Sequence, residues 1–119
     1  MEVLGDRRRS QPAPPKHVFE ALTHPHRDPA RPWLKLLDDE VEPAVVEARE
    51  HDLVVWSSIW RMHPRARLRF EIEPDRSGQG SLLRWILLDE IDPGPASVGH
   101  MRKRVQQLIN AELRFTFGQ

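Results

Sequence analysis

The chain of 119 residues contains no cysteine and no tyrosine. Without cysteine it can form neither a disulfide nor a thiolate zinc site, and it has no cysteine nucleophile. No apolar run approaches the roughly 20 residues that cross a bilayer, and the first residues lack the apolar segment of a secretory signal. Basic and acidic residues number 18 each, so the formal net charge is zero and a general basic surface for nucleic acid is not expected. We therefore expect a cytoplasmic protein without a membrane span.

Familiar catalytic and cofactor motifs are also missing. The sequence has no glycine-rich dinucleotide fingerprint, no phosphate-binding loop and no nucleophile elbow. His24, His26 and Asp28 fall within five residues and are chemically able to hold a metal. Prolines on both sides of His26 indicate an exposed loop without the supporting hydrogen bonds of a metal site. We expect neither a metal nor a cofactor.

The residues that are present suit one soluble globular domain over residues 1–119, with 39% hydrophobic and 30% charged residues. The first half of the chain is broken by prolines. Residues 2–9 could form a short strand, and the three prolines of 11–15 make a turn. A helix is predicted to begin at Pro15, where a missing N–H is harmless, and to end at Pro25. The stretch 33–39 is predicted to form one or two helical turns.

Strands follow in the middle of the chain. The patterns predict them at 44–50, 53–60, 68–74 and 81–90. The last two alternate apolar with polar residues around a turn of Asp, Ser and Gly, as a hairpin does. The residues expected on one face of this hairpin are Leu68, Phe70, Ile72, Leu83, Trp85 and Leu87.

A long amphipathic helix is predicted from Val98 to about Phe115, with Ser97 as its N-cap. Its apolar residues recur at helical spacing; they are Val98, Met101, Val105, Leu108 and Ile109. Such a stripe has to be buried, and the hairpin face is the large apolar surface available to it. The expected fold is therefore α+β, an antiparallel sheet wrapped around one long helix. A gap between the two would be a natural ligand cavity.

Several stretches together resemble the START-like superfamily, also called SRPBCC or polyketide cyclase/dehydrase and related to the Bet v allergens. They are APPKHVFEALTHP, LVVWSS, RLRFEIEP followed by GxGSLLRW, and HMRKRVQQLINAELR, in that order. The resemblance implies a helix-grip fold, in which a curved antiparallel sheet wraps around a long C-terminal helix with short helices after the first strand. Members bind hydrophobic or amphipathic small molecules between sheet and helix. Some catalyse cyclisation or dehydration, and one branch activates a chaperone ATPase.

The chain departs from this superfamily in its strand count. We predict four or five strands, whereas the family usually has six or seven. A smaller cavity, or a sheet completed by a second subunit, would account for this difference, and an unpaired edge strand would favour a homodimer.

The candidate ligand site combines sheet and helix residues. Trp56 and Trp60 are evenly spaced on one strand with Ser58 between them, so the indoles could form a platform for a flat apolar ligand. The alternative, which the pattern favours, is that these aromatic residues are ordinary core. The full candidate set is Trp56, Ser58, Trp60, Phe70, Trp85, Met101, Val105 and Leu108.

A catalytic alternative centres on Glu112, which follows Leu108 by one helical turn. A partly buried carboxylate there could act as a base in cyclase-type chemistry, with Arg69, Arg84 or Arg104 as its positive partner. The alternative is that Glu112 turns outward to water or to a surface arginine such as Arg114. His100 and Arg104 are neighbours at i and i+4 and are expected to face solvent; facing the gap instead, the pair could orient a carbonyl or phenolate oxygen of a ligand.

Three functions are compatible with the sequence. The first is binding of a small hydrophobic or amphipathic ligand. The second is a polyketide cyclase or dehydratase activity with Glu112 as base. The third is a protein-interaction module like the chaperone-activating branch, without a sizeable cavity. A void of several hundred Å³ between sheet and helix would favour the first two, and a solidly packed sheet would favour the third.

Overall fold

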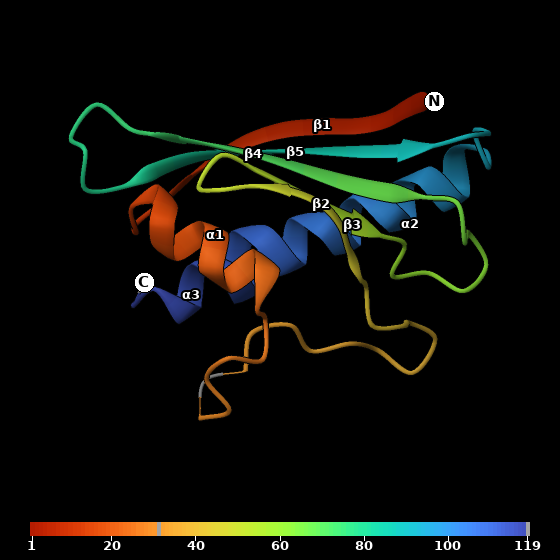
Figure 1. Cartoon of the computed structure of the whole chain (residues 1–119). Coiled ribbons are helices and arrows are strands. Elements are labelled where there is room, and N and C mark those ends of the chain that lie inside the picture. The colour runs from red at the N-terminus through yellow and green to blue at the C-terminus, as the bar shows by residue number, and fades with distance from the viewer. Residues whose placement is uncertain (31, 119) are drawn as a thin grey trace.

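The computed structural model describes residues 1–30 and 32–118, and its layout is a sheet lying on helices (Figure 1). In chain order the elements are β1 (Glu2–Gln11), α1 (Pro15–Thr23), β2 (Val45–Arg49), β3 (Leu53–Ser57), β4 (Arg67–Pro74), β5 (Ser81–Asp89), α2 (Pro95–Gln106), the π-helical segment η1 (Gln107–Leu113) and α3 (Arg114–Thr116). The five strands form one antiparallel sheet in the order β1-β5-β4-β3-β2. The α+β helix-grip arrangement is therefore confirmed.

The hairpin of β4 and β5 forms the centre of the sheet. Phe70 pairs with Trp85 across the two strands, and both side chains are fully buried. The turn between the strands is fixed by Asp75, whose Oδ1 accepts hydrogen bonds from the backbone N–H groups of Ser77 and Gly78 at 3.0 Å each. The predicted alternation of this hairpin is confirmed, because every second residue faces the helices.

The last three helical segments run without a break and are called the rod here. The rod begins at Pro95, three residues before the predicted start, and its N-cap is Gly94 instead of Ser97. The reason is local: Gly94 adopts a φ of 101° that suits glycine, and proline is favoured in the first helical turn. The predicted apolar stripe is buried against the sheet; its members are Val98, Met101, Val105, Leu108 and Ile109.

The predicted helical turns at 33–39 are wrong. Residues 32–44, called the strap here, contain no helix and form only an isolated bridge between Glu40 and Trp60. In Figure 1 the chain after α1 descends below the rod before it returns to the sheet at β2. Other contacts replace the helical hydrogen bonds. The Lys35 carbonyl accepts from the distant Arg104, and the Leu37 N–H donates to the nearby Glu40 carboxylate.

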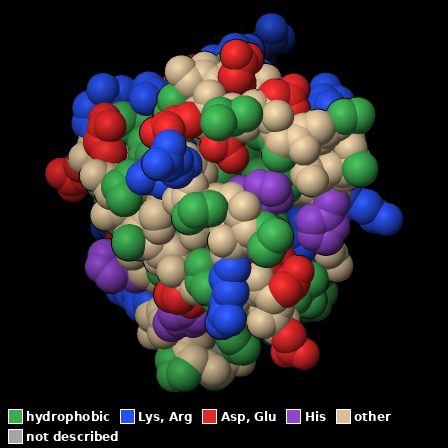
Figure 2. All heavy atoms as spheres, turned by 90° about the vertical axis from the view of Figure 1, so that its right-hand side faces the viewer, with side chains coloured by type: hydrophobic (Ala, Val, Ile, Leu, Met, Phe, Trp, Pro, Cys, Tyr) green, Lys and Arg blue, Asp and Glu red, His purple; other side chains and the backbone are tan. Residues whose placement is uncertain are grey.

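The surface is mixed in charge. Figure 2 shows acidic, basic and histidine side chains interspersed with apolar ones on the face at the right-hand end of Figure 1. This face therefore carries no field of a single sign. In the described part of the chain no helix is long and apolar enough to cross a membrane.

Candidate functional site

The predicted ligand-binding residues lie together between the sheet and the rod. All eight are buried, namely Trp56, Ser58, Trp60, Phe70, Trp85, Met101, Val105 and Leu108. The Trp56 ring is stacked on Trp33 with a centroid distance of 5.9 Å and meets Phe70 edge-on at 4.8 Å. These rings fill the space between the sheet and the rod, called the layer here, so a ligand that enters this space has to displace side chains.

Ser58 and Trp60 differ in detail from their predicted placement. β3 ends at Ser57, so neither residue belongs to a regular strand, and Trp60 instead bridges to Glu40. The Ser58 hydroxyl donates to the Trp60 carbonyl at 3.1 Å and accepts from the Trp60 N–H at 3.0 Å. Both of its hydrogen-bonding roles are therefore used within the chain.

The four tryptophans differ in whether their indole N–H groups find a partner. Trp33 and Trp56 donate their Nε1–H groups to the α1 carbonyls of Ala21 and Leu22, at 3.2 Å and 2.9 Å. The Nε1 atoms of Trp60 and Trp85 are buried and have no partner among the described residues. A buried donor without an acceptor costs about 1–3 kcal/mol. An acceptor oxygen reaching either indole would remove that cost.

Two neighbouring hollows of the described surface lie beside Trp33 and the C-terminal end of the rod. Two pockets, of about 560 and 480 Å³, have Trp33 and Thr116 in common. The smaller one, called the Trp33 groove here, runs between the strap and the end of the rod. Its lining includes Trp33, Lys35, Glu112, Phe115 and Thr116. The groove combines two aromatic rings with one ammonium and one carboxylate, which suits an amphipathic molecule.

Glu112 thus lies at a pocket, but away from its predicted cationic partners. Arg69 and Arg84 lie on the opposite face of the sheet, where both bind Glu71. Arg114 donates to the Ser10 carbonyl at 2.7 Å. Lys35 is the basic residue that shares the groove with Glu112.

Arg104 is buried, so its predicted exposure is wrong, whereas His100 is exposed as expected. The Arg104 side chain is 5% exposed and forms an ion pair with Glu40, whose side chain is 1% exposed. The spacing contained this signal, because Arg104 lies three residues after Met101 and four before Leu108 on the apolar stripe. Nothing in the sequence pattern pointed to Glu40 as its partner.

The outer face of the sheet, away from the rod, carries a second set of ion pairs. Arg84 in β5 binds Asp6 in β1 and Glu71 in β4, and Arg69 binds the other oxygen of Glu71 at 2.9 Å. The hydrogen bond from Arg69 lowers the pKa of Glu71. The hydrogen bond from Arg84 likewise lowers the pKa of Asp6. The network ties three strands together on a solvated surface.

The histidine-rich loop is held by ordinary polar contacts. His26 Nε2 lies 2.8 Å from the Glu42 carboxylate, and His24 Nδ1 lies 3.0 Å from the Thr23 hydroxyl. Within the described residues, no three potential metal ligands of the His, Asp or Glu type come together.

No protein-family profile and no curated protein matches the chain. Its similarity to solved structures is clear. CalU16 from Micromonospora echinospora aligns with a TM-score of 0.71 at 15% identity over 95% of this chain and 73% of that one. The Aha1 dimer from Colwellia psychrerythraea aligns with a TM-score of 0.68 at 16% identity over 99% and 100% of the two chains. Ara h 8.0201 aligns with a TM-score of 0.56 at 13% identity over 97% of each chain.

These neighbours share the curved antiparallel sheet and the long C-terminal helix with this chain over nearly its whole length. At identities of this size the likeness concerns the fold and leaves function to be argued from the site. The chain has the helix-grip fold of the START-like (SRPBCC, Bet v-like) superfamily.

Proposed function

We propose that the chain binds a small hydrophobic or amphipathic molecule that enters at the Trp33 groove. The observation that carries this proposal is the pair of pockets meeting at Trp33 and Thr116, with volumes of about 560 and 480 Å³. Ligand sites in proteins are usually clefts of about 300–1,000 Å³ lined by aromatic residues and a few polar groups. The superfamily resemblance points to the same class of ligand.

The chemistry of the groove suggests how such a molecule would lie. The Phe115 ring is 75% exposed and lines the groove together with Trp33. These two rings would cover an apolar body, while the Lys35 ammonium and the Glu112 carboxylate would bind polar ends. A neutral or zwitterionic amphiphile fits this pair of charges better than a multiply charged anion.

The groove also offers a route to the predicted inner site. Trp33 is stacked on Trp56, so rotation of the Trp33 ring would open the layer in which Trp56, Phe70 and Trp85 lie. A ligand carbonyl that passed this ring could accept a hydrogen bond from Trp60 or Trp85, whose N–H groups lack partners among the described residues. The eight predicted residues would then form the inner part of the site.

Titration with the fluorescent probe 1-anilinonaphthalene-8-sulfonate tests the entry site. Thr116→Trp should abolish binding by filling the groove, and Phe115→Ala should weaken it by roughly tenfold through loss of aromatic contact. Ile91→Ala is the matched control, because Ile91 is 72% exposed and lies outside the groove. Equal affinity of the wild type and Thr116→Trp would refute the assignment. Native mass spectrometry of protein from its own host would identify a retained ligand.

A cyclase or dehydratase activity is a second candidate, favoured by the position of Glu112 in the groove beside Lys35. Glu112 would take a proton next to an enolisable carbonyl, and the Lys35 ammonium would stabilise the resulting oxyanion. Glu112→Gln should then remove turnover while lowering ligand affinity far less, because the amide keeps the size of the carboxyl group and can still form hydrogen bonds. Turnover that survives this substitution would eliminate Glu112 as the base.

A protein-interaction role is a third candidate, favoured by the packed layer between sheet and rod and by an open sheet edge. The Aha1 neighbour was solved as a dimer, and a homodimer is the assembly that the strand count led us to expect. Native mass spectrometry separates this candidate from the first, because it reports a retained small molecule and the oligomeric state together.

A further inference from the structure

The edge of the sheet at β2 is open. All five residues of β2 are exposed, and β2 pairs with β3 on one side and is the last strand of the sheet. In an antiparallel ladder every second residue turns its N–H and C=O away from the neighbouring strand. The outward groups of β2 are therefore available to pair with another strand.

The two edges of the sheet differ in charge. β1, at the other edge, carries three consecutive arginines at 7–9, and like charges on an edge oppose pairing between copies. β2 instead carries one acidic and one basic residue, Glu47 and Arg49, separated by Ala48. Among the two edges, β2 is the one whose charges do not repel those of an identical strand.

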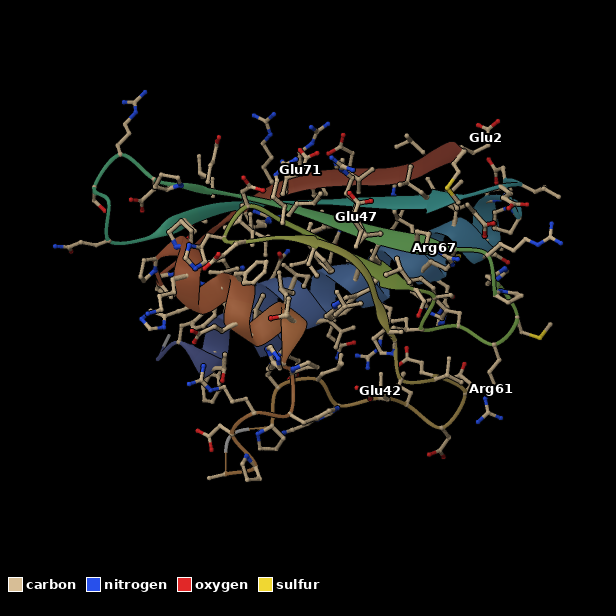
Figure 3. All side chains as sticks on the ribbon, viewed as in Figure 1. Glu2, Glu42, Glu47, Arg61, Arg67 and Glu71 are labelled. Atoms are coloured by element: carbon tan, nitrogen blue, oxygen red, sulfur yellow. The ribbon has the colours of Figure 1, made fainter. Side chains whose placement is uncertain are left out.

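Register places Glu47 and Arg49 on the same face. Glu47 pairs with Val55, which pairs with Arg69, and Arg49 pairs with Leu53, which pairs with Glu71. Arg69 and Glu71 lie on the outer face of the sheet, so Glu47 and Arg49 lie there as well. Figure 3 shows Glu47 and Glu71 on the side of the sheet away from the rod.

We propose that β2 pairs antiparallel with β2 of a second copy, with Ala48 at the twofold axis. This register sets Glu47 of each copy opposite Arg49 of the other, which gives two opposite-charge pairs on the outer face. Centring the axis on Glu47 would bring two carboxylates together, and centring it on Val46 would set Glu47 opposite Val45. Charge complementarity therefore selects the register as well as the partner.

The geometry of the chain is compatible with this pairing. Arg49 uses its Nε to bind Asp52, and the remaining guanidinium N–H groups can bind a carboxylate from the second copy. The small side chain of Ala48 lets the two backbones approach on the inner face. The five strands of each copy would join into one continuous sheet. The proposal involves no residue of the Trp33 groove, so it stands or falls independently of ligand binding.

Sedimentation equilibrium over a concentration series tests the proposal. The wild type should be a dimer. Glu47→Arg and Arg49→Glu should each raise the dimer dissociation constant by about tenfold or more, because each places like charges opposite one another. The double variant Glu47→Arg/Arg49→Glu should recover most of the lost affinity, because the charges across the axis are again complementary, while the contact of residue 49 with Asp52 is lost.

Glu2→Arg is the matched control, since Glu2 is exposed in β1 at the opposite edge, and it should leave the dimer unchanged. Circular dichroism should show unaltered folding for all variants, because the substituted side chains are exposed. A wild type that stays monomeric at every concentration would overturn the proposal. A partner other than a second copy would then have to bind the β2 edge. Single variants that dimerise as the wild type does, or a double variant that stays weak, would also overturn it.

Discussion

The guanidinium of Arg104 lies buried against the carboxylate of Glu40, with Nε 2.7 Å from Oε2 and Nη2 2.8 Å from Oε1. Nη2 also donates to the Lys35 carbonyl at 2.7 Å. The pair joins the middle of the rod to the strap, which carries Trp33 and Lys35 to the groove. This bidentate ion pair thus fixes the position of the strap residues that line the candidate ligand site.

Glu40→Gln should lower the free energy of unfolding by about 3–5 kcal/mol, because it leaves the buried Arg104 charge without its counter-ion. Urea denaturation followed by tryptophan fluorescence measures this loss. Glu90→Gln is the matched control. It removes the carboxylate of an exposed ion pair with Arg65, and exposed pairs contribute at most about 1 kcal/mol. Equal losses in the two variants would contradict a buried role for Glu40.

Gly5→Ala should destabilise the fold by about 1–3 kcal/mol through overpacking. A Cβ at Gly5 would lie 2.9 Å from Cζ3 of Trp85 and 3.1 Å from Cγ of Arg102, and the Trp85 ring is fully buried. Gly99→Ala is the contrasting substitution. Its Cβ would meet nothing within 4 Å, and alanine in a helix should stabilise the chain by about 0.4–1 kcal/mol. Thermal denaturation of both variants should show shifts of opposite sign, and shifts of the same sign would refute the packing argument.

The outer-face network should make stability fall in acid. Arg69 and Arg84 lower the pKa values of Glu71 and Asp6 from their ordinary values of 4.5 and 3.8. The unfolded chain therefore binds protons at a higher pH than the folded one does, so acidification favours unfolding. This contribution is complete above about pH 4.5 and disappears as the pH falls through the lowered folded-state pKa values.

Glu71→Gln should therefore reduce the loss of unfolding free energy between about pH 7 and pH 3. Urea denaturation at a series of pH values provides the measurement. Glu73→Gln changes an exposed residue of the same strand that lies outside the network, and it should leave the pH dependence as it is in the wild type. Parallel curves for the wild type and Glu71→Gln would show that the network does not contribute.

Local patterns account for most of the elements. The alternation of Leu68, Phe70 and Ile72 predicts both the strand β4 and its buried face, because side chains on a strand alternate between its two sides. The prolines at 15 and 25 predict where α1 begins and ends, because proline is tolerated in the first turn of a helix and stops a helix at later positions. The fold that the superfamily resemblance implies was then confirmed by the solved structures that share it.

The candidate groove was much less accessible from the sequence. Glu112 drew attention because it follows the apolar stripe, but its neighbours Trp33 and Lys35 come from a stretch that was predicted to be helical. Arg104 lay on the buried face by its spacing, yet its partner Glu40 is 64 residues away along the chain. Contacts at this separation leave no periodic trace, because periodicity reports only which side of an element is buried.

The sequence by itself determined most of the strands, the two main helices and their apolar faces, because these follow from side-chain volume and backbone sterics within a few residues. The tertiary structure alone decided where the strap lies, which charges are enclosed together and which strands form the two edges of the sheet. Those features depend on the balance between desolvation and pairing of groups that meet only when the chain has folded.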